Sequence, residues 1–191
     1  MTTAKFKFPF NETKALEATA EFLRLAGGVL GRFHLVKCIY LAERTSLLRR
    51  NRPICGGYYV SMEHGPVHSD VYNRIKGQVP NATAWKRHVA TGGGDDVQLK
   101  RGVPPALLCE SEMEIIRETY EKFGVMTFQE LWRYVHDKGN IPEYVNPGKS
   151  SIKIDVRTLL GFLGKSESDI EIIVREARLS HEIDLLLPSI H

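Results

Sequence analysis

Hydrophobic residues occupy nearly every side of the segment 35–42, LVKCIYLA. A surface helix shows one apolar stripe, whereas a helix that is apolar all round is enclosed by other elements. Residues 35–50 are therefore predicted to form a buried central helix. Asn51-Arg52-Pro53 ends it, because proline disfavours helical geometry in the residue before it and cannot donate to the helical hydrogen bonds.

A short strand and a second helix are predicted next. The run 58–62 is rich in aromatic and β-branched residues, which favours a strand with Tyr59 facing inward and Tyr58 outward. Gly65-Pro66 is expected to break this strand, and residues 67–76 are expected to form a helix that ends at Gly77. The inward positions of this helix are Val67, Val71 and Ile75.

The rest of the chain reads as helices around one small hairpin. The predicted elements are a helix from Asn11 or Thr13 to about Ala26, hairpin arms at 85–90 and 97–100, helices at 111–123 and from 127 to near 138, a short helix around 156–163 and a longer one after Ser166. Thr127 and Glu130 form a capping box at the start of the helix from 127. The apolar stripe of that helix, expected to face the core, is Phe128, Leu131, Trp132 and Val135. The fold class is therefore mainly α with a small inserted antiparallel β-sheet, compact around one central helix. The loop 141–151 is the expected boundary between a domain at 1–150 and a helical extension at 151–191.

Length and composition favour an ordinary globular protein. The 191 residues suffice for one hydrophobic core, and no run reaches the roughly 18 apolar residues of a membrane span. The first ten residues lack the apolar core of a secretory signal, so a cytoplasmic protein without membrane contact is expected. Cys38, Cys55 and Cys109 form no metal-binding or disulfide pattern and are expected to be small buried thiols in a reducing compartment.

No pattern in the chain predicts chemistry. His64 and His68 have the spacing of a helical metal pair with Cys55 nearby, but Gly65-Pro66 separates them and spacing offers no fourth ligand. The glycine run 92–94 lacks the lysine of a phosphate loop and precedes two aspartates. No nucleophile or metalloprotease motif is present. We therefore expect no metal, no cofactor and no enzymatic activity.

Candidate binding residues lie on and after the central helix. Lys37, Tyr40 and Arg44 fall at i, i+3 and i+7 and share one helix face. Tyrosine and arginine anchor many protein interfaces. Several basic residues could also form a rim, although a solvated face is the favoured interpretation and the net charge of +3 is small. The residues of this basic rim are Arg44, Arg49, Arg50, Arg52, Lys86, Arg87, Lys100 and Arg101.

A longer pattern spans the central helix and the turn after it. It consists of Lys37-x-x-Tyr40-Leu41-Ala42-x-Arg44, Arg52-Pro53-Ile54-x-Gly56, Tyr59, His64-Gly65-Pro66-Val67 and Val71-Tyr72. This pattern resembles the Panacea domain of SocA-like antitoxins, which also occurs in phage-associated proteins.

The resemblance implies a protein that neutralises a cognate toxin by direct contact, and that can act as an adaptor delivering the toxin to a protease. The residues expected to bind the partner are Lys37, Tyr40, Arg44, Tyr58, His64, His68 and Tyr72. A nucleic-acid-binding regulator of a phage or mobile element is the alternative, disfavoured because no basic recognition helix is evident.

The segment 183–188 is apolar for the end of a chain. It either docks on the body of the protein or meets another chain, as in a homodimer. Docking is favoured because exposed apolar patches are costly in soluble proteins.

Overall fold

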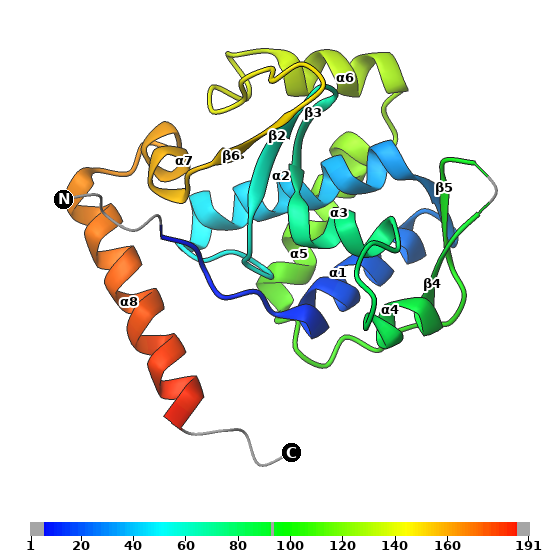
Figure 1. The fold of residues 1–191 in the computed structure, drawn as a ribbon, viewed down its shortest axis with the longest axis horizontal. Helices are drawn as coiled ribbons and strands as arrows, with labels where there is room; N and C mark the ends of the chain where they lie inside the picture. Colours follow the sequence, from blue (N-terminus) through cyan, green and yellow to red (C-terminus); the bar gives the residue numbers. More distant parts are fainter. Residues whose placement is uncertain (1–5, 93, 187–191) are drawn as a thin grey trace.

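The computed structural model describes residues 6–92 and 94–186, which fold into a mainly helical structure (Figure 1). Within these residues it has two small antiparallel sheets of three strands each. The predicted class is confirmed, with one sheet more than expected. In chain order the elements are α1 (Glu12–Leu25), β1 (Val29–Gly31), α2 (Arg32–Arg50), β2 (Tyr59–Met62), β3 (Gly65–His68), α3 (Ser69–Ile75), α4 (Thr83–His88), β4 (Val89–Thr91), β5 (Asp96–Leu99), α5 (Glu110–Thr119), the π-helical turn η1 (Tyr120–Gly124), α6 (Phe128–His136), β6 (Ser151–Ile154), α7 (Val156–Phe162) and α8 (Glu167–Leu186).

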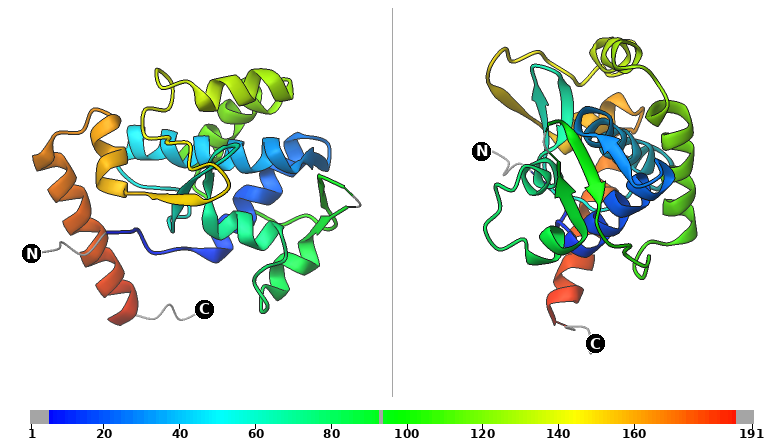
Figure 2. Two further views of the ribbon diagram at one scale, coloured as in Figure 1. Left: turned by 45° about the horizontal axis from the view of Figure 1, so that its top comes forward. Right: turned by 90° about the vertical axis from the view of Figure 1, so that its right-hand side faces the viewer.

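The α2 helix crosses the middle of the molecule, as predicted for the central helix. It contacts α1 and α5 on one side and β3 on the other (Figures 1 and 2). Leu35, Cys38 and Leu47 are fully buried on different sides of the helix, which explains why its sequence lacks an apolar stripe. The helix ends at Asn51, which adopts the left-handed conformation common just after a helix.

The sheet beside α2 has the strand order β3-β2-β6. β2 and β3 form a hairpin across Glu63 and His64. The first strand ends before Gly65-Pro66 as predicted, but Gly65 starts a second paired strand that was not predicted. The predicted helix at 67–76 was placed too early, because α3 begins at Ser69. Pro66 is tolerated because β3 is an edge strand, whose outer side needs no hydrogen-bond donor. Tyr59 is buried and Tyr58 is exposed, as predicted.

The second sheet has the order β1-β5-β4 and covers the end of α1. The predicted arm at 85–90 was largely wrong, since residues 83–88 form the short helix α4 and only 89–91 form β4. Trp85 of α4 is buried in the core. The three-residue strand β1 was not predicted, because Gly27 and Gly28 precede it in the sequence and Gly31 is its last residue.

The α5 and α6 helices begin with capping interactions. Glu112 accepts a hydrogen bond from the Cys109 backbone, so α5 starts earlier than the predicted Ser111. Cys109 is exposed at this helix start, so the expectation of a buried thiol was wrong for Cys109, whereas Cys38 and Cys55 are buried as predicted. Thr127 and Glu130 cap α6 reciprocally, as predicted. Leu131 and Val135 of α6 are buried as expected.

The expected apolar stripe of α6 is only partly in the core. Phe128 and Trp132 remain 47% and 39% exposed, so the assignment of these two aromatic side chains to the core was wrong.

The last part of the chain continues the β3-β2-β6 sheet and then leaves the body. β6 pairs with β2, so residues after 150 share the sheet of the preceding part, and the division at residue 150 stays a prediction. The first half of α8 buries Ile170, Ile173 and Val174.

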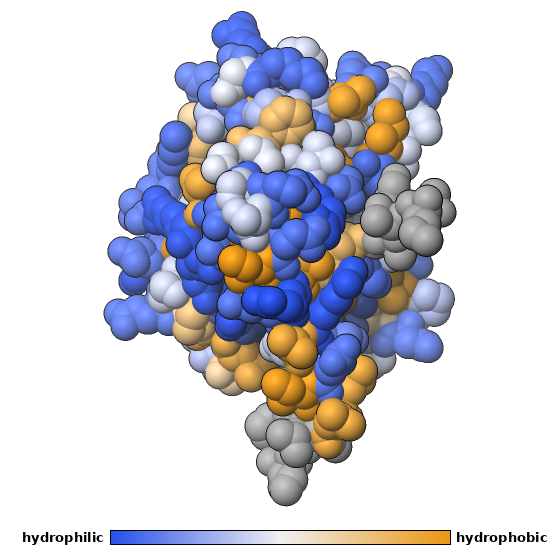
Figure 3. Space-filling model, turned by 90° about the vertical axis from the view of Figure 1, so that its left-hand side faces the viewer, coloured by the Kyte–Doolittle hydropathy of each residue, from blue (hydrophilic) through white to orange (hydrophobic). Residues whose placement is uncertain are grey.

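The second half of α8 projects from the body, and hydrophobic side chains gather near its end (Figures 1 and 3). Leu179, Ile183, Leu185 and Leu186 are exposed, the last of them by 78%, so the expected docking of this segment was wrong for residues 183–186. Leu187 and Pro188 lie outside the described residues. Within the part of the chain that the structure describes, no helix has both the length and the hydropathy needed to cross a membrane.

Candidate partner-binding site

Tyr40 and Arg44 converge on one buried carboxylate. The Tyr40 hydroxyl donates to Glu143 Oε1 at 2.6 Å, and Arg44 Nε donates to the same oxygen at 2.7 Å. Burial, followed by the proximity of Glu143, raises the pKa of Tyr40 well above its ordinary value. The segment after α6 thereby closes over this face of α2, and Tyr40 serves the fold rather than an exposed surface.

A second buried carboxylate, Glu43, joins α2 to the turn before β2. Its Oε1 accepts hydrogen bonds from the Cys55 backbone and thiol, both at 2.7 Å, and its Oε2 accepts one from the Tyr59 hydroxyl at 2.7 Å. Burial raises the pKa of the Cys55 thiol and of Tyr59, and the Glu43 charge raises both further. These bonds hold the motif residues around Gly56 against the central helix.

An open groove of about 410 Å³ lies beside the N-terminal half of α2. It is bounded by the first turns of α2, the β2–β3 turn, the start of α6 and the loop at 148–150. We call it the Lys37 groove. Its lining includes Arg32, Phe33, Lys37, Glu63, His64, Tyr72, Asp95, Phe128 and Lys149.

Lys37 is only 2% exposed although it lines this groove. Its Nζ donates one hydrogen bond, to the carbonyl oxygen of Pro66 at 3.0 Å. Burial lowers the pKa of Lys37 from 10.5 to about 7. Among the described residues no carboxylate pairs with it, so the buried amine has no counter-charge.

Gly65 explains how the hairpin can approach Lys37 so closely. Its φ of 94° lies in the left-handed region that favours glycine. A Cβ at this position would lie 2.7 Å from Val135 Cγ2 and 3.3 Å from Lys37 Nζ. The glycine of the His64-Gly65-Pro66-Val67 motif therefore lets β3 pack between α2 and α6.

Aromatic side chains form the rim of the groove. The rings of Phe33 and Phe128 lie 4.5 Å apart between centroids. Farther along α6, Trp132 stacks on His136, whose Nε2 lies 3.1 Å from the backbone oxygen of Glu63. Partly exposed aromatic side chains beside an open groove are typical anchors of protein–protein interfaces.

The structure divides the seven predicted binding residues into three groups. Lys37, His64 and Tyr72 come together in the Lys37 groove. Tyr40 and His68 are buried and Arg44 is partly buried, each with internal hydrogen-bond or ion-pair partners. Tyr58 lies apart from the groove, where Lys7 and Lys153 place their amines 4.4 and 4.6 Å from its ring centroid.

The predicted basic rim is partly neutralised. Arg44 pairs with Glu143, Arg49 with Glu118 and Arg50 with Glu112. Arginines already paired with carboxylates offer little to phosphate groups.

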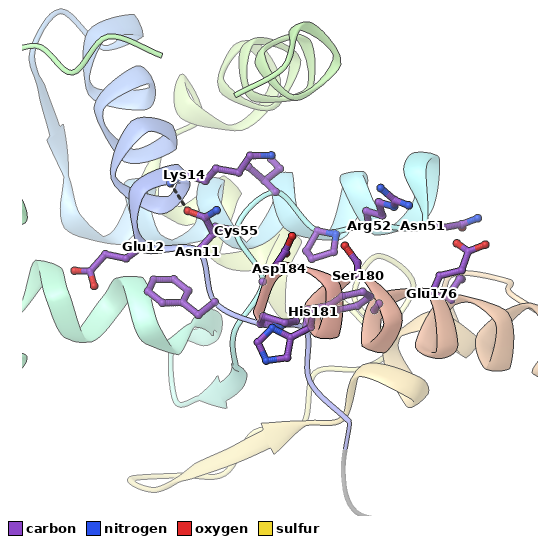
Figure 4. Close-up of a pocket in the computed structure, with 18 residues that line it drawn as sticks. Asn11, Glu12, Lys14, Asn51, Arg52, Cys55, Glu176, Ser180, His181 and Asp184 are labelled. Carbon is purple, nitrogen blue, oxygen red and sulfur yellow. Dashed lines mark hydrogen bonds between the residues drawn. The ribbon is translucent and has the colours of Figure 1, made fainter. Parts of the chain in front are cut away.

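A second cavity, of about 520 Å³, separates α8 from the body (Figure 4). The N-terminal segment around Phe8 and the turn at 51–56 form one wall, and the side of α8 that carries Ile173 and Ala177 forms the other. Ser180, His181 and Asp184 of α8 lie along this cavity (Figure 4). One wall of this cavity is the single projecting helix α8, so the Lys37 groove is the better-enclosed site.

Glu43, Cys55 and His68 place possible metal-ligating atoms within 4.8 Å of one another. Of the two histidines considered from the sequence, only His68 joins this cluster. The Val71 backbone donates to His68 Nδ1 at 3.3 Å, so the neutral ring carries its proton on Nε2, which faces the Gly56 oxygen. A metal binds an unprotonated nitrogen and a thiolate, whereas burial raises the pKa of Cys55. The cluster therefore has the features of a closed hydrogen-bond network.

Sequence reasoning missed Glu143, Phe33 and Phe128. Glu143 lies in a proline-containing segment interpreted as a loop, although the apolar residues Ile141 and Tyr144 around it signalled that the segment is buried. Phe33 precedes the segment assigned to the central helix, and Phe128 was assigned to the core. Only their juxtaposition in space shows that they share a groove.

The family model described as Antitoxin SocA-like, Panacea domain matches residues 35–140, which include most of α2, the β2–β3 hairpin and α6. No curated protein and no solved structure matches the chain. Since the family model covers more than half of the 191 residues, the chain belongs to the SocA-like antitoxin family and carries its Panacea domain.

Proposed function

We propose that this protein is an antitoxin that neutralises a cognate protein toxin by direct contact, and that the toxin binds at the Lys37 groove. The protein acts through binding and not through catalysis. The observation that carries the proposal is the groove itself: an open, aromatic-lined hollow whose walls come largely from the segment that matches the antitoxin family.

The composition of the groove supports a protein partner. Phe33 and Phe128 offer apolar contact area, while Arg32, His64 and Lys149 supply polar contacts around it. Interfaces commonly combine an apolar centre with a polar rim. Phe128 is the most exposed aromatic side chain of the groove and is the expected anchor.

The alternative, a nucleic-acid-binding regulator, has weaker support. Arg44, Arg49 and Arg50 of the proposed basic rim are engaged with Glu143, Glu118 and Glu112. Binding to duplex DNA that weakens steeply as salt rises would favour this alternative.

Co-expression with the product of the adjacent reading frame tests the proposal. We expect that product to arrest growth alone and the present protein to restore growth. Purified, the two proteins should form a complex. A harmless neighbour, or one that stays toxic in the presence of this protein, contradicts the proposal.

Two matched variants locate the contact. Phe128→Ala should weaken toxin binding at least tenfold, because the truncation of an interface anchor removes most of its contact area. Val125→Ala is the control, since Val125 is also exposed but does not line the groove. If both variants bind the toxin with equal affinity, the toxin contacts a part of the surface outside the groove.

The level of the toxin in the rescued cells distinguishes two mechanisms. A constant toxin level with restored growth indicates neutralisation by sequestration. A toxin level that falls, and recovers when cellular proteases are deleted, indicates that the protein acts as a proteolytic adaptor.

A further inference from the structure

Lys37 is an unusual group to find in the wall of an open groove. A buried ammonium is costly unless a counter-charge and hydrogen bonds compensate it. Lysine has three N–H donors, and the Pro66 oxygen accepts from one of them. The remaining donors have no carboxylate partner in the described part of the chain, although glutamates neutralise Arg44 and Arg50 of the same helix.

The other charged groups of the groove leave a positive excess. Arg32 and Asp95 pair with each other at its edge. Glu63 and Lys149, both exposed, are the remaining opposite pair of charges, and His64 and Tyr72 complete the titratable lining. Lys37 is thus the cation that no charge of the groove offsets. A negatively charged group is the chemistry that the groove lacks.

The surroundings of Lys37 define what can carry that charge. The Phe33 ring centroid lies 5.4 Å from Lys37 Nζ, and the Phe128 ring packs against Phe33. Because the amine is buried, a group that reaches it must enter the groove and cannot simply lie across the rim. An acidic side chain flanked by apolar residues satisfies both conditions.

We propose that the Lys37 groove binds an acidic side chain carried on an apolar segment of the toxin, with Lys37 contacting the carboxylate and Phe33 and Phe128 packing on the flanking residues. This inference rests on the proposed function and specifies the chemistry of its partner. It assigns Lys37 a role in recognition in addition to its place in the fold.

The main test compares Lys37→Met with Lys122→Met in affinity for the purified toxin. Methionine has about the length of the lysine stem and no charge, and Lys122 is an exposed lysine outside the groove. At pH 6 we expect Lys37→Met to bind at least tenfold more weakly and Lys122→Met to bind as the wild type does. One aspartate or glutamate of the toxin, changed to its amide, should cause the same loss and add nothing to Lys37→Met.

The pH dependence of binding supplies a second readout. With a pKa of about 7, Lys37 is mostly charged at pH 6 and mostly neutral at pH 8, so wild-type affinity should fall about tenfold between them. The toxin affinity of Lys37→Met should not change between pH 6 and pH 8. His64 lines the same groove, so His64→Asn is measured in parallel. This variant should show the same fall in toxin affinity as the wild type.

Wild-type protein allows the same test without a variant. On addition of toxin, the side-chain NMR signal of Lys37 in ¹³C-lysine-labelled protein should report a raised pKa, because a carboxylate favours the charged amine. An unchanged Lys37 pKa in the complex would overturn the inference even if Lys37→Met failed to fold.

The outcomes separate this inference from the proposed function. If the wild type binds toxin but Lys37→Met binds within twofold and keeps the pH dependence, the inference is wrong and the antitoxin function stands. If the wild-type protein does not bind the toxin, both the inference about Lys37 and the proposed antitoxin function are wrong. If millimolar sodium acetate displaces the toxin from wild type and not from Lys37→Met, the carboxylate contact is supported.

Discussion

Arg44 Nε donates a hydrogen bond to Glu143 Oε1 at 2.7 Å, and this ion pair ties the central helix to the segment that follows α6. The Glu143 side chain is fully enclosed, whereas Arg44 remains partly open to solvent. Tyr40 donates to the same oxygen, and Glu143 Oε2 has no hydrogen-bond partner among the described residues. The carboxylate therefore depends on Arg44 for its charge compensation.

Arg44→Ala is expected to lower the free energy of unfolding by about 3 kcal/mol, because it leaves a buried carboxylate unpaired. Urea denaturation at pH 7 measures this loss. Arg49→Ala is the control on the same helix, since Arg49 pairs with Glu118 at the surface and its loss should cost under about 1 kcal/mol. Equal losses for the two variants would show that Glu143 is not enclosed.

Glu43→Gln should cost about 2 kcal/mol of unfolding free energy. The carboxylate accepts three hydrogen bonds, from the Cys55 backbone, the Cys55 thiol and the Tyr59 hydroxyl. An amide replaces one acceptor oxygen with a donor, so at least one buried donor loses its partner. Glu121→Gln, at an exposed position, should change stability by less than about 0.5 kcal/mol. Thermal and urea unfolding of both variants would reveal a similar, small effect if the Glu43 network were open to water.

The stability of the protein should rise with pH through the effect of Lys37. Its pKa is about 7 in the folded protein and 10.5 in the reference state, so the unfolded chain binds more protons between these values. The free energy of unfolding should therefore increase by about 2 kcal/mol between pH 7 and pH 9. The same measurement on Lys37→Met isolates this contribution, since the other groups titrate in both proteins. A parallel pH profile for the variant would mean that Lys37 is solvated.

Two isoleucines of α8 should differ sharply when truncated. Ile173→Ala is expected to cost about 2 to 5 kcal/mol because Ile173 packs in the core. Ile183→Ala should cost less than about 0.5 kcal/mol because Ile183 lies on the projecting half of the helix. A large loss for Ile183→Ala, together with a concentration-dependent melting temperature, would show that another copy covers this surface.

The local sequence was sufficient to predict features that depend on neighbouring residues, such as helix periodicity, helix capping and strand alternation. The all-round apolar character of residues 35–42 identified the central helix, and the Thr127–Glu130 capping box identified the start of α6. The alternation of Tyr58 and Tyr59 placed one outside and one inside. The family pattern also lies within this segment, so membership could be recognised from the chain alone.

Long-range contacts decided what local patterns could not. Gly65-Pro66 has the sequence of a break but forms an edge strand, which packs against Val135 of α6, a residue far along the chain. The sequence predicts Arg44 as a partner-binding residue at the surface, yet Glu143, 99 residues away, pairs with it.

The sequence alone determined that a buried helix carries Lys37, Tyr40 and Arg44 on one face, since helical periodicity is a property of neighbouring residues. Only the tertiary structure decided the different environments of these three side chains. Tyr40 and Arg44 find a carboxylate from a distant segment, while Lys37 finds none and borders an open groove. The reason is that burial and charge compensation depend on which distant segments pack against a helix, and periodicity carries no information about that.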